Sequence, residues 1–231
     1  MSALDSESST EVLAAFKSAW TATTREYIQR RLNSERCLQA YLFFHLKRKL
    51  SSDYNIFVEA TIRIPKEIGT NTEEKRVAVD MLVCKGKTVY AAIELKFSPK
   101  GQSRLAGIKK DILSLSDIRK RRSKSDRVRI ELPRYRNSAS ELMSLNIHST
   151  RKLIFAAFGK VDGSRLNKDI FWASHIPKEG RWKSASECPP QFCVALAQTD
   201  NQGGAYPIFF GPPFDRQTGY KRKAETSGED A

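Results

Sequence analysis

Hydrophobic residues recur every three or four positions over the first 50 residues, which is the period of an amphipathic helix. Leu13 and Trp20 share one apolar face, and the spacing around them predicts a first helix. This helix begins at Ser9 or Thr10, either of which can cap it, and runs towards Arg31.

A second helix is predicted from Glu35 to about Leu50, with Asn33 or Ser34 as its N-cap. Its apolar stripe consists of Leu38, Tyr41, Leu42 and Leu46. Glu35 and Gln39 are four positions apart, so their side chains lie on one edge of this helix.

From residue 56 the pattern has the shorter period of β-strands. Residues 57–64 form the first predicted strand, and residues 77–83 form the second, which is apolar on both faces except at Asp80. Residues 88–97 form the third, beyond a turn at residues 85–87. The three segments predict a β-meander with a charged residue in its middle strand.

Helical spacing returns over residues 105–118, and a short helix is predicted near residues 138–145. Apolar runs of strand length follow at residues 153–158, 170–173 and 194–197. This order of elements predicts an α/β fold with a mixed, partly antiparallel sheet flanked by helices.

The length of 231 residues suits one domain with a substantial core. We predict an N-terminal helical extension at residues 1–32 and a main domain at residues 33–216. Residues 217–231 are polar and charged, and we expect them to form a disordered tail.

Charge points to a polyanionic partner, because 40 lysines and arginines against 26 aspartates and glutamates give a net charge of +14. Nucleic acid is the partner that we favour, since each neutralised phosphate releases counterions. An anionic membrane surface is the alternative, but no stretch approaches the roughly 18 apolar residues of a spanning helix. A basic, solvated surface without a ligand also stays open.

The four cysteines show no zinc-knuckle spacing, so we expect reduced structural thiols. The first residues are polar and acidic and lack the basic and apolar regions of a secretory signal. We therefore expect a cytoplasmic protein. His45, His148 and His175 lack the spacing of a metal site or a catalytic triad, and we interpret them as structural or surface residues.

Three charged residues interrupt the apolar strands: Asp80 in the second, and Glu94 and Lys96 in the third. Burying such charges costs several kcal/mol unless they serve one another or a metal ion. Side chains alternate along a strand, so Glu94 and Lys96 share a face. A three-residue loop at residues 85–87 would place Asp80 opposite Ala92 on that same face, whereas a two-residue loop would turn Asp80 to the other face. We expect the three-residue loop, because Gly86 suits that form of turn.

Asp80, followed after a hairpin by Glu94-Leu95-Lys96 and preceded by a helix bearing Glu35, resembles the PD-(D/E)XK nuclease superfamily. The resemblance covers roughly residues 33–118. It departs from the pattern in one place, because Val79 stands where the signature has proline.

The resemblance implies a restriction-endonuclease-like core and a function in hydrolysing phosphodiester bonds. It assigns Asp80 and Glu94 as metal ligands, gives the backbone carbonyl of Leu95 to the same metal, and makes Lys96 the assistant of the attacking water. The resemblance also implies that Glu35 supplements the metal site. The expected metal is Mg²⁺, which favours carboxylate oxygens, and Mn²⁺ is expected to substitute.

These implications predict a magnesium-dependent endodeoxyribonuclease whose partner is DNA. RNA is not excluded, and a homodimer stays open because many enzymes of this superfamily pair to cut both strands. The alternatives are a catalytically inactive nucleic-acid-binding protein of the same fold, and a module whose basic surface binds an acidic protein.

The segment at residues 119–136 contains nine basic residues against two acidic ones, a density typical of phosphate-contacting surfaces. The residues predicted to contact nucleic acid are Arg119, Lys120, Arg121, Arg122, Lys124, Arg127 and Arg129. A flexible charged loop without a ligand is the alternative.

Each site residue also has an ordinary structural explanation. Glu94 and Lys96 would form a solvated strand face if Asp80 lay in a turn. Glu35 would simply favour the helix dipole in the first helical turn. Lys109, Lys110 and Asp111 lie on the following helix, where phosphate contact is one interpretation and a solvated helix face is the one we favour.

Overall fold

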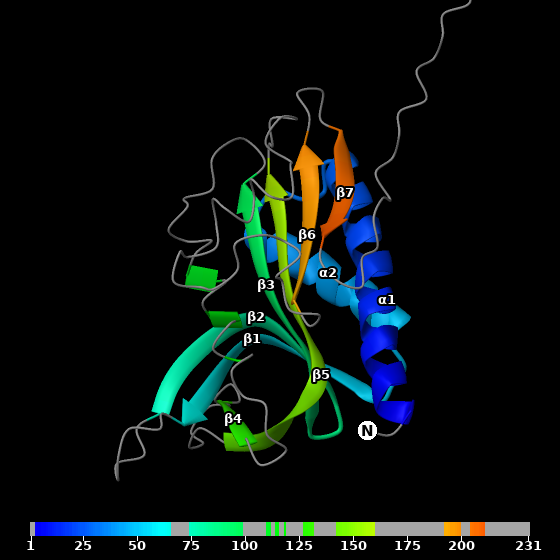
Figure 1. Ribbon diagram of the computed structural model, residues 1–231. Coiled ribbons are helices and arrows are strands. Elements are labelled where there is room, and N and C mark those ends of the chain that lie inside the picture. The colour runs from blue at the N-terminus through cyan, green and yellow to red at the C-terminus, as the bar shows by residue number, and fades with distance from the viewer. Residues whose placement is uncertain are drawn as a thin grey trace, which may run out of the picture.

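Figure 1 shows the computed structural model of the chain. It describes residues 3–65, 74–98, 110–111, 114–115, 118, 127–131, 142–159, 192–199 and 204–210. The helices are α1 (Ala3–Ile28) and α2 (Glu35–Lys49). The strands are β1 (Tyr54–Pro65), β2 (Glu74–Lys85), β3 (Thr88–Ser98), β4 (Arg127–Glu131), β5 (Leu142–Gly159), β6 (Phe192–Thr199) and β7 (Ala205–Phe210).

The second helix forms as its sequence predicts. The Ser34 hydroxyl caps α2 by accepting a hydrogen bond from the Cys37 amide at 3.2 Å. Leu38, Leu42 and Leu46 are fully buried along its apolar stripe. The N-cap and the buried face of this helix are therefore confirmed.

The first helix begins at Ala3, earlier than the predicted cap at Ser9 or Thr10. Ser9 is buried inside the helix. Serine and threonine are tolerated there when the hydroxyl bonds a carbonyl one turn back, as Thr23 does to Ala19 at 2.8 Å. The prediction of the helix start was wrong because a capping residue type does not have to cap.

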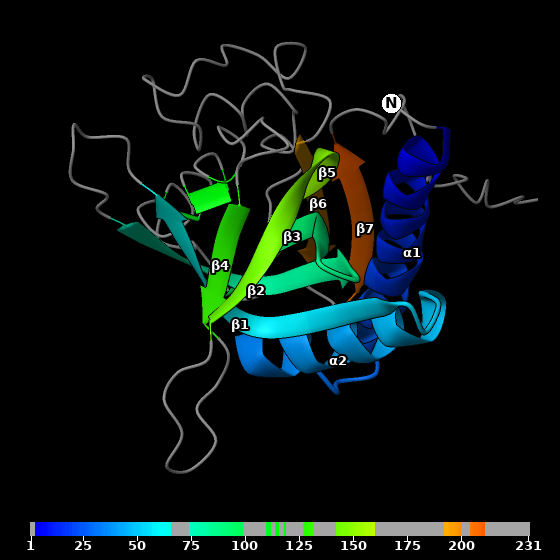
Figure 2. The same cartoon turned by 90° about the horizontal axis from the view of Figure 1, so that it is seen from below.

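Within the described residues, seven strands form one mixed sheet in the order β3-β2-β1-β4-β5-β6-β7. An additional pairing of β3 with β5 closes a ring of five strands, visible from below in Figure 2. The long β5 makes this closure possible: its first part runs antiparallel to β4, and its second part runs parallel to β3 and β6. The chain is thus an α/β protein with helices flanking a mixed sheet.

The sheet separates two apolar cores. One lies between the sheet and the two helices. There Phe16, Trp20 and Leu42 are buried against strand residues such as Ile93 and Ile154. The other lines the inner side of the ring and the opposite face of β3, β5 and β6. The indole N–H of Trp20 lies 3.4 Å from the carbonyl of Leu196 in β6. Helix α1 therefore shares its core with the rest of the described chain, and the boundary drawn at residue 32 marks the start of the resemblance.

Two strands escaped the sequence prediction, and one predicted helix is wrong in part. Residues 127–131 form β4 and residues 205–210 form β7. Residues 142–145, predicted as the end of a short helix, belong to β5 because alternate residues such as Leu145 and Ile147 enter the core. Of the helix predicted at 105–118, the described residues are helical; the strand at 170–173 and the tail at 217–231 lie outside the described residues.

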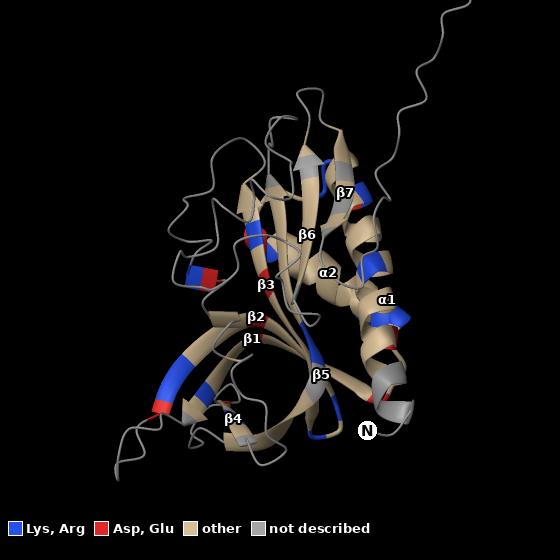
Figure 3. Ribbon diagram, in the orientation of Figure 1, with Lys and Arg blue, Asp and Glu red and all other residues tan. Residues whose placement is uncertain are grey.

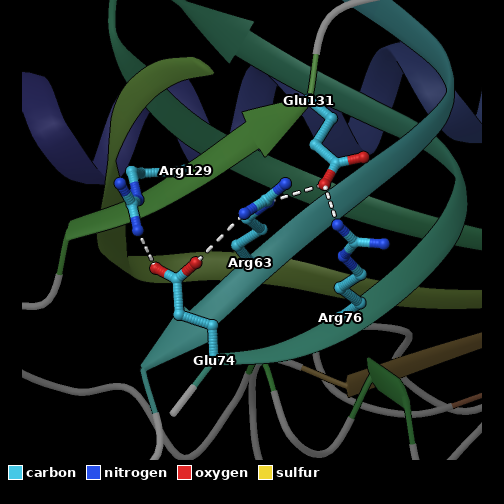
Figure 4. Close-up of polar contacts among 5 residues, drawn as sticks. All are labelled: Arg63, Glu74, Arg76, Arg129 and Glu131. Carbon is cyan, nitrogen blue, oxygen red and sulfur yellow. Dashed lines mark hydrogen bonds and ion pairs between the residues drawn. The ribbon is translucent and has the colours of Figure 1, made fainter. Parts of the chain in front are cut away.

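An ionic network joins β4 to β1 and β2 on the far side of the ring from the β3–β5 pairing (Figure 4). Arg63 of β1 bonds Glu131 of β4 at 2.5 Å and Glu74 of β2 at 3.4 Å. Arg76 lies 3.3 Å from Glu131, and Arg129 pairs with Glu74. Each glutamate contacts two arginines, so the network links three strands. Its three arginines and two glutamates together carry a net charge of +1.

Candidate active site

The hairpin between β2 and β3 differs from the predicted one. Lys85 pairs with Thr88, so the turn has two residues, and Gly86 adopts a left-handed conformation with φ of 56°. Leu82, not Asp80, lies opposite Ala92. The predicted three-residue loop and its register were wrong.

A β-bulge nevertheless returns Asp80 to the expected face. Val83 pairs with Ala91 while Cys84 pairs with Val89, so Tyr90 is an extra residue on β3. The register then reaches Met81 opposite Ile93, and the next positions along the two strands are Asp80 and Glu94. Asp80 therefore lies level with Glu94, and a hydrogen bond joins their side chains.

The paired part of β2 and β3 ends at Met81 and Ile93, and the two strands separate beyond it. We call this place the strand fork. Polar side chains satisfy the backbone groups that the separation releases. The Asp80 carboxylate accepts a hydrogen bond from the Leu95 amide at 2.6 Å. On the other side, the Gln39 amide donates to the Asp80 carbonyl at 3.0 Å.

Helix α2 supplies both of its predicted polar edge residues to the fork. Besides Gln39, the Glu35 carboxylate accepts a hydrogen bond from the Phe97 amide at 3.2 Å. These contacts join one edge of α2 to β2 and to β3 at the fork. A role confined to the helix dipole does not account for the position of Glu35.

The carbonyl of Leu95 also faces the fork. In a β-strand, the N–H and C=O of one residue point to the same edge, as the paired residues of an antiparallel ladder show. The Leu95 N–H points to Asp80. Its carbonyl oxygen is therefore on the edge of β3 that borders the fork, where the resemblance requires an oxygen ligand.

Glu94 is buried, with 5% of its surface exposed, and this excludes the solvated strand face that was the alternative explanation. Burial raises its pKa to about 10, and the negative charges of Asp80 and Asp111, together with a hydrogen bond to Asp80, act in the same direction. At neutral pH the Glu94 carboxyl is therefore protonated in the absence of a cation.

Lys96 lies between two acids from different elements. Its ammonium nitrogen is 3.0 Å from Oδ2 of Asp111 and 3.8 Å from Oε1 of Glu35. Burial disfavours the charged form, but attraction to Asp111, Glu35 and Asp80 outweighs burial and raises the pKa of Lys96. The side chain is therefore an ammonium ion and not a proton acceptor. Figure 3 shows acidic and basic positions together along β3.

Asp111 was missed by sequence reasoning, which placed it on a solvated face. Its side chain is only 13% exposed. The signal was present: Asp111 precedes Leu115 by four positions and Ile118 by seven, and both are buried. An acid on the core-facing side of a helix is the pattern that finds this residue.

No protein-family model, curated protein or solved structure matches this chain. The function must therefore be argued from the residues of the fork. Among the described residues, no three His, Cys, Asp or Glu side chains converge closely enough to form a metal-binding group by themselves. Two carboxyl groups with a backbone carbonyl and water are a set that magnesium accepts.

The predicted nucleic-acid surface falls largely outside the described residues. These positions are Arg119, Lys120, Arg121, Arg122 and Lys124. Arg127 begins β4, and its side chain is not described. Arg129 is 44% exposed and pairs with Glu74, so it also has a structural contact. Its role in binding stays a prediction.

The other candidate groups have structural environments. Burial raises the pKa of Cys84 and of Cys193 to about 12, so both remain thiols at neutral pH. His45 lies 3.6 Å from Glu26, and His148 stacks on Tyr90 with 4.6 Å between ring centroids. In the described part of the chain, no helix is long and apolar enough to cross a membrane.

Proposed function

We propose that the chain is a metal-dependent nuclease that hydrolyses phosphodiester bonds of DNA in the manner of an endonuclease. The observation that carries the proposal is the strand fork, where Asp80 and the buried Glu94 meet directly beside the ammonium ion of Lys96. Two adjacent carboxyl groups suit a divalent cation, and a cation could replace the proton that Glu94 retains.

The residues of the fork fit magnesium, with manganese as a substitute. Asp80 and Glu94 would hold the ion through carboxylate oxygens, and Leu95 through its carbonyl. When bound, a magnesium ion polarises the scissile phosphate and lowers the pKa of bound water. Glu94 must lose its proton to bind the ion, so metal affinity should rise with pH.

The chain's own groups supply positioning and charge. Asp80 accepts a hydrogen bond from the Leu95 amide, and this contact ties the Asp80 carboxylate to β3. The Lys96 ammonium can orient a water molecule and offset the negative charge that grows on the phosphate. Because Lys96 is charged, it acts through its field and its hydrogen bonds and not by taking a proton.

The resemblance to the PD-(D/E)XK superfamily supports this proposal through the same residues. Asp80, Glu94, Leu95 and Lys96 carry its motif, and Glu35 carries its helical acid. The order of the described elements around the fork, from α2 through β1, β2 and β3 to helical residues near Asp111, agrees with the helix, strands and helix order of that core.

DNA is the proposed substrate because of the net charge of +14 and the basic residues from Arg119 to Arg129. A catalytically inactive nucleic-acid-binding protein shares these features. An inactive DNA-binding protein would not need a carboxyl at this position. Burying Glu94 beside other acids costs the fold free energy, and a metal-binding role accounts for that cost.

Incubation of the purified chain with supercoiled plasmid tests the proposal. Nicked or linear DNA should appear with magnesium or manganese and not with EDTA. A salt-dependent gel shift in EDTA would separate a DNA-binding protein from a module that binds an acidic protein. DNA binding without cleavage in either metal would favour the inactive alternative.

A further inference from the structure

Lys96 has two acidic neighbours, and Asp111 is the better placed of the two. The ammonium nitrogen is 3.0 Å from Asp111 but 3.8 Å from Glu35. The side chain of Asp111 is 13% exposed, whereas that of Glu35 is 44% exposed. An ion pair shielded from water is stronger than an exposed one at equal distance, so Asp111 has the stronger hold on Lys96.

Packing fixes the position of Asp111 itself. The helical residues Leu115 and Ile118 share its helix face and are buried in the core that also contains Phe155 of β5. Lys96 lies in β3 and is paired with Ala157 of β5, which belongs to the same core. The lysine and its partner are thus anchored to the same core from two directions.

Glu35 is held differently. Its other carboxylate oxygen accepts a hydrogen bond from Phe97, so this side chain braces β3 and reaches Lys96 at longer range. Without Asp111, the ammonium of Lys96 would have Glu35 as its nearest acid among the ion pairs at the fork. The lysine would then move towards α2 and away from its present position.

We propose that Asp111 is a positioning residue that sets the location of the Lys96 ammonium at the fork. The inference rests on the proposed nuclease function for its kinetic consequence, but the pairing itself is independent of activity. Asp111 acts through Lys96 and has no contact of its own with substrate in this proposal. A shift of about 1 Å in such a group can lower a rate by roughly a hundredfold.

The kinetic test is a double-mutant cycle with Lys96→Ala, Asp111→Asn and the double variant, read as single-turnover cleavage at saturating magnesium and DNA. Lys96→Ala should lower the rate by about a hundredfold or more, at every magnesium concentration. Asp111→Asn should lower it by about ten- to a hundredfold with unchanged DNA affinity. In the Lys96→Ala background, Asp111→Asn should then change the rate by less than about twofold.

Two further variants separate positioning from folding. Asp111→Glu keeps the carboxylate and should recover part of the rate lost in Asp111→Asn. Glu11→Gln is the matched control, because it removes a carboxylate that accepts a hydrogen bond from Tyr54 at 2.7 Å, beside the hairpin turn. It should leave the rate unchanged. Multiplicative losses in the double variant would overturn the proposal.

The pairing has a test that needs no activity. Acetylation of Lys96 by acetic anhydride, followed by mass spectrometry, should be slow in the wild-type chain and several-fold faster in Asp111→Asn. Glu35→Gln should have the smaller effect. Equal reactivity in wild type and Asp111→Asn, or a larger effect of Glu35→Gln, would overturn the positioning role. A chain that shows the expected protection but never cleaves DNA would contradict the proposed function alone.

Discussion

At the scale of single residues, Glu94 is the costliest group in the fork. Its carboxyl is buried and subject to the negative charges of Asp80 and Asp111, and its pKa of about 10 compares with an ordinary value of 4.5. The proposed metal-binding role of Glu94 and the stability of the fold therefore conflict at this position. Such conflicts are typical of active sites, where charge is held ready for a ligand.

The raised pKa of Glu94 predicts how stability depends on pH in EDTA. Between pH 4.5 and about 10, the folded chain holds a proton on Glu94 that the unfolded chain releases. This group's contribution to stability is therefore complete below pH 4.5 and falls as pH rises through that window. Glu94→Gln has no proton to lose, so its melting temperature relative to wild type should increase steadily from pH 5 to pH 9. A difference that does not vary with pH would contradict the assignment.

The backbone of Glu59, close to the strand fork, is strained. It has a left-handed φ of 52° in β1, between Val58, which pairs with Met81, and Ala60, which pairs with Val79. Glu59 thus lies level with Asp80, where the hairpin is distorted. A non-glycine residue in this conformation costs about 1 kcal/mol.

Replacing Glu59 by glycine should therefore stabilise the chain by about 1 kcal/mol in urea unfolding. Thr61→Gly, two residues further along the regular part of β1, is the control and should destabilise it. Destabilisation by Glu59→Gly would show that the side chain of Glu59 contributes more than its backbone conformation costs.

At the scale of elements, the sequence predicted the parts that carry one clear period. The cap and stripe of α2 and the three strands of the meander followed from local spacing. The shared face of Asp80, Glu94 and Lys96 was also expected, but from a wrong register. A two-residue turn and a bulge at Tyr90 together restored the face, and only long-range packing reveals a bulge.

The sequence prediction missed strand β4 because its segment is rich in charged residues. Its sequence, Arg-Val-Arg-Ile-Glu, alternates strictly, and Val128 and Ile130 are buried. Because arginines and lysines surround it, the whole segment was interpreted as a surface that contacts phosphate. Because the partners of Arg129 and Glu131 come from β1 and β2, the position of β4 beside β1 has no local signal in the sequence.

The basic segment before β4 remains the predicted DNA surface. Arg121→Ala with Arg122→Ala should weaken binding to all DNA sequences alike and reduce the slope of log affinity against log salt by about one to two units. Titrations at several salt concentrations measure both quantities. Wild-type affinity and slope in the double variant would exclude this segment from the phosphate contacts.

At the scale of the whole molecule, the closed ring of strands explains how a site forms at the fork. The ring turns β2 and β1 away towards β4, while β3 continues into the sheet with β5, β6 and β7. The acids that contact β3 or Lys96 at the fork come from α2, β2 and the helical residue Asp111. The site thus depends on residues separated by 76 positions, from Glu35 to Asp111.

Cleavage of supercoiled plasmid by Asp80→Asn and by Glu94→Gln, beside wild type and Glu11→Gln, tests the central claim most directly. Both fork variants remove a ligand from the proposed metal site and leave the basic residues intact. Cleavage with magnesium should fall by about a hundredfold or more in each, while DNA binding in EDTA and cleavage by Glu11→Gln stay at the wild-type level. Unchanged turnover in either fork variant would contradict the account.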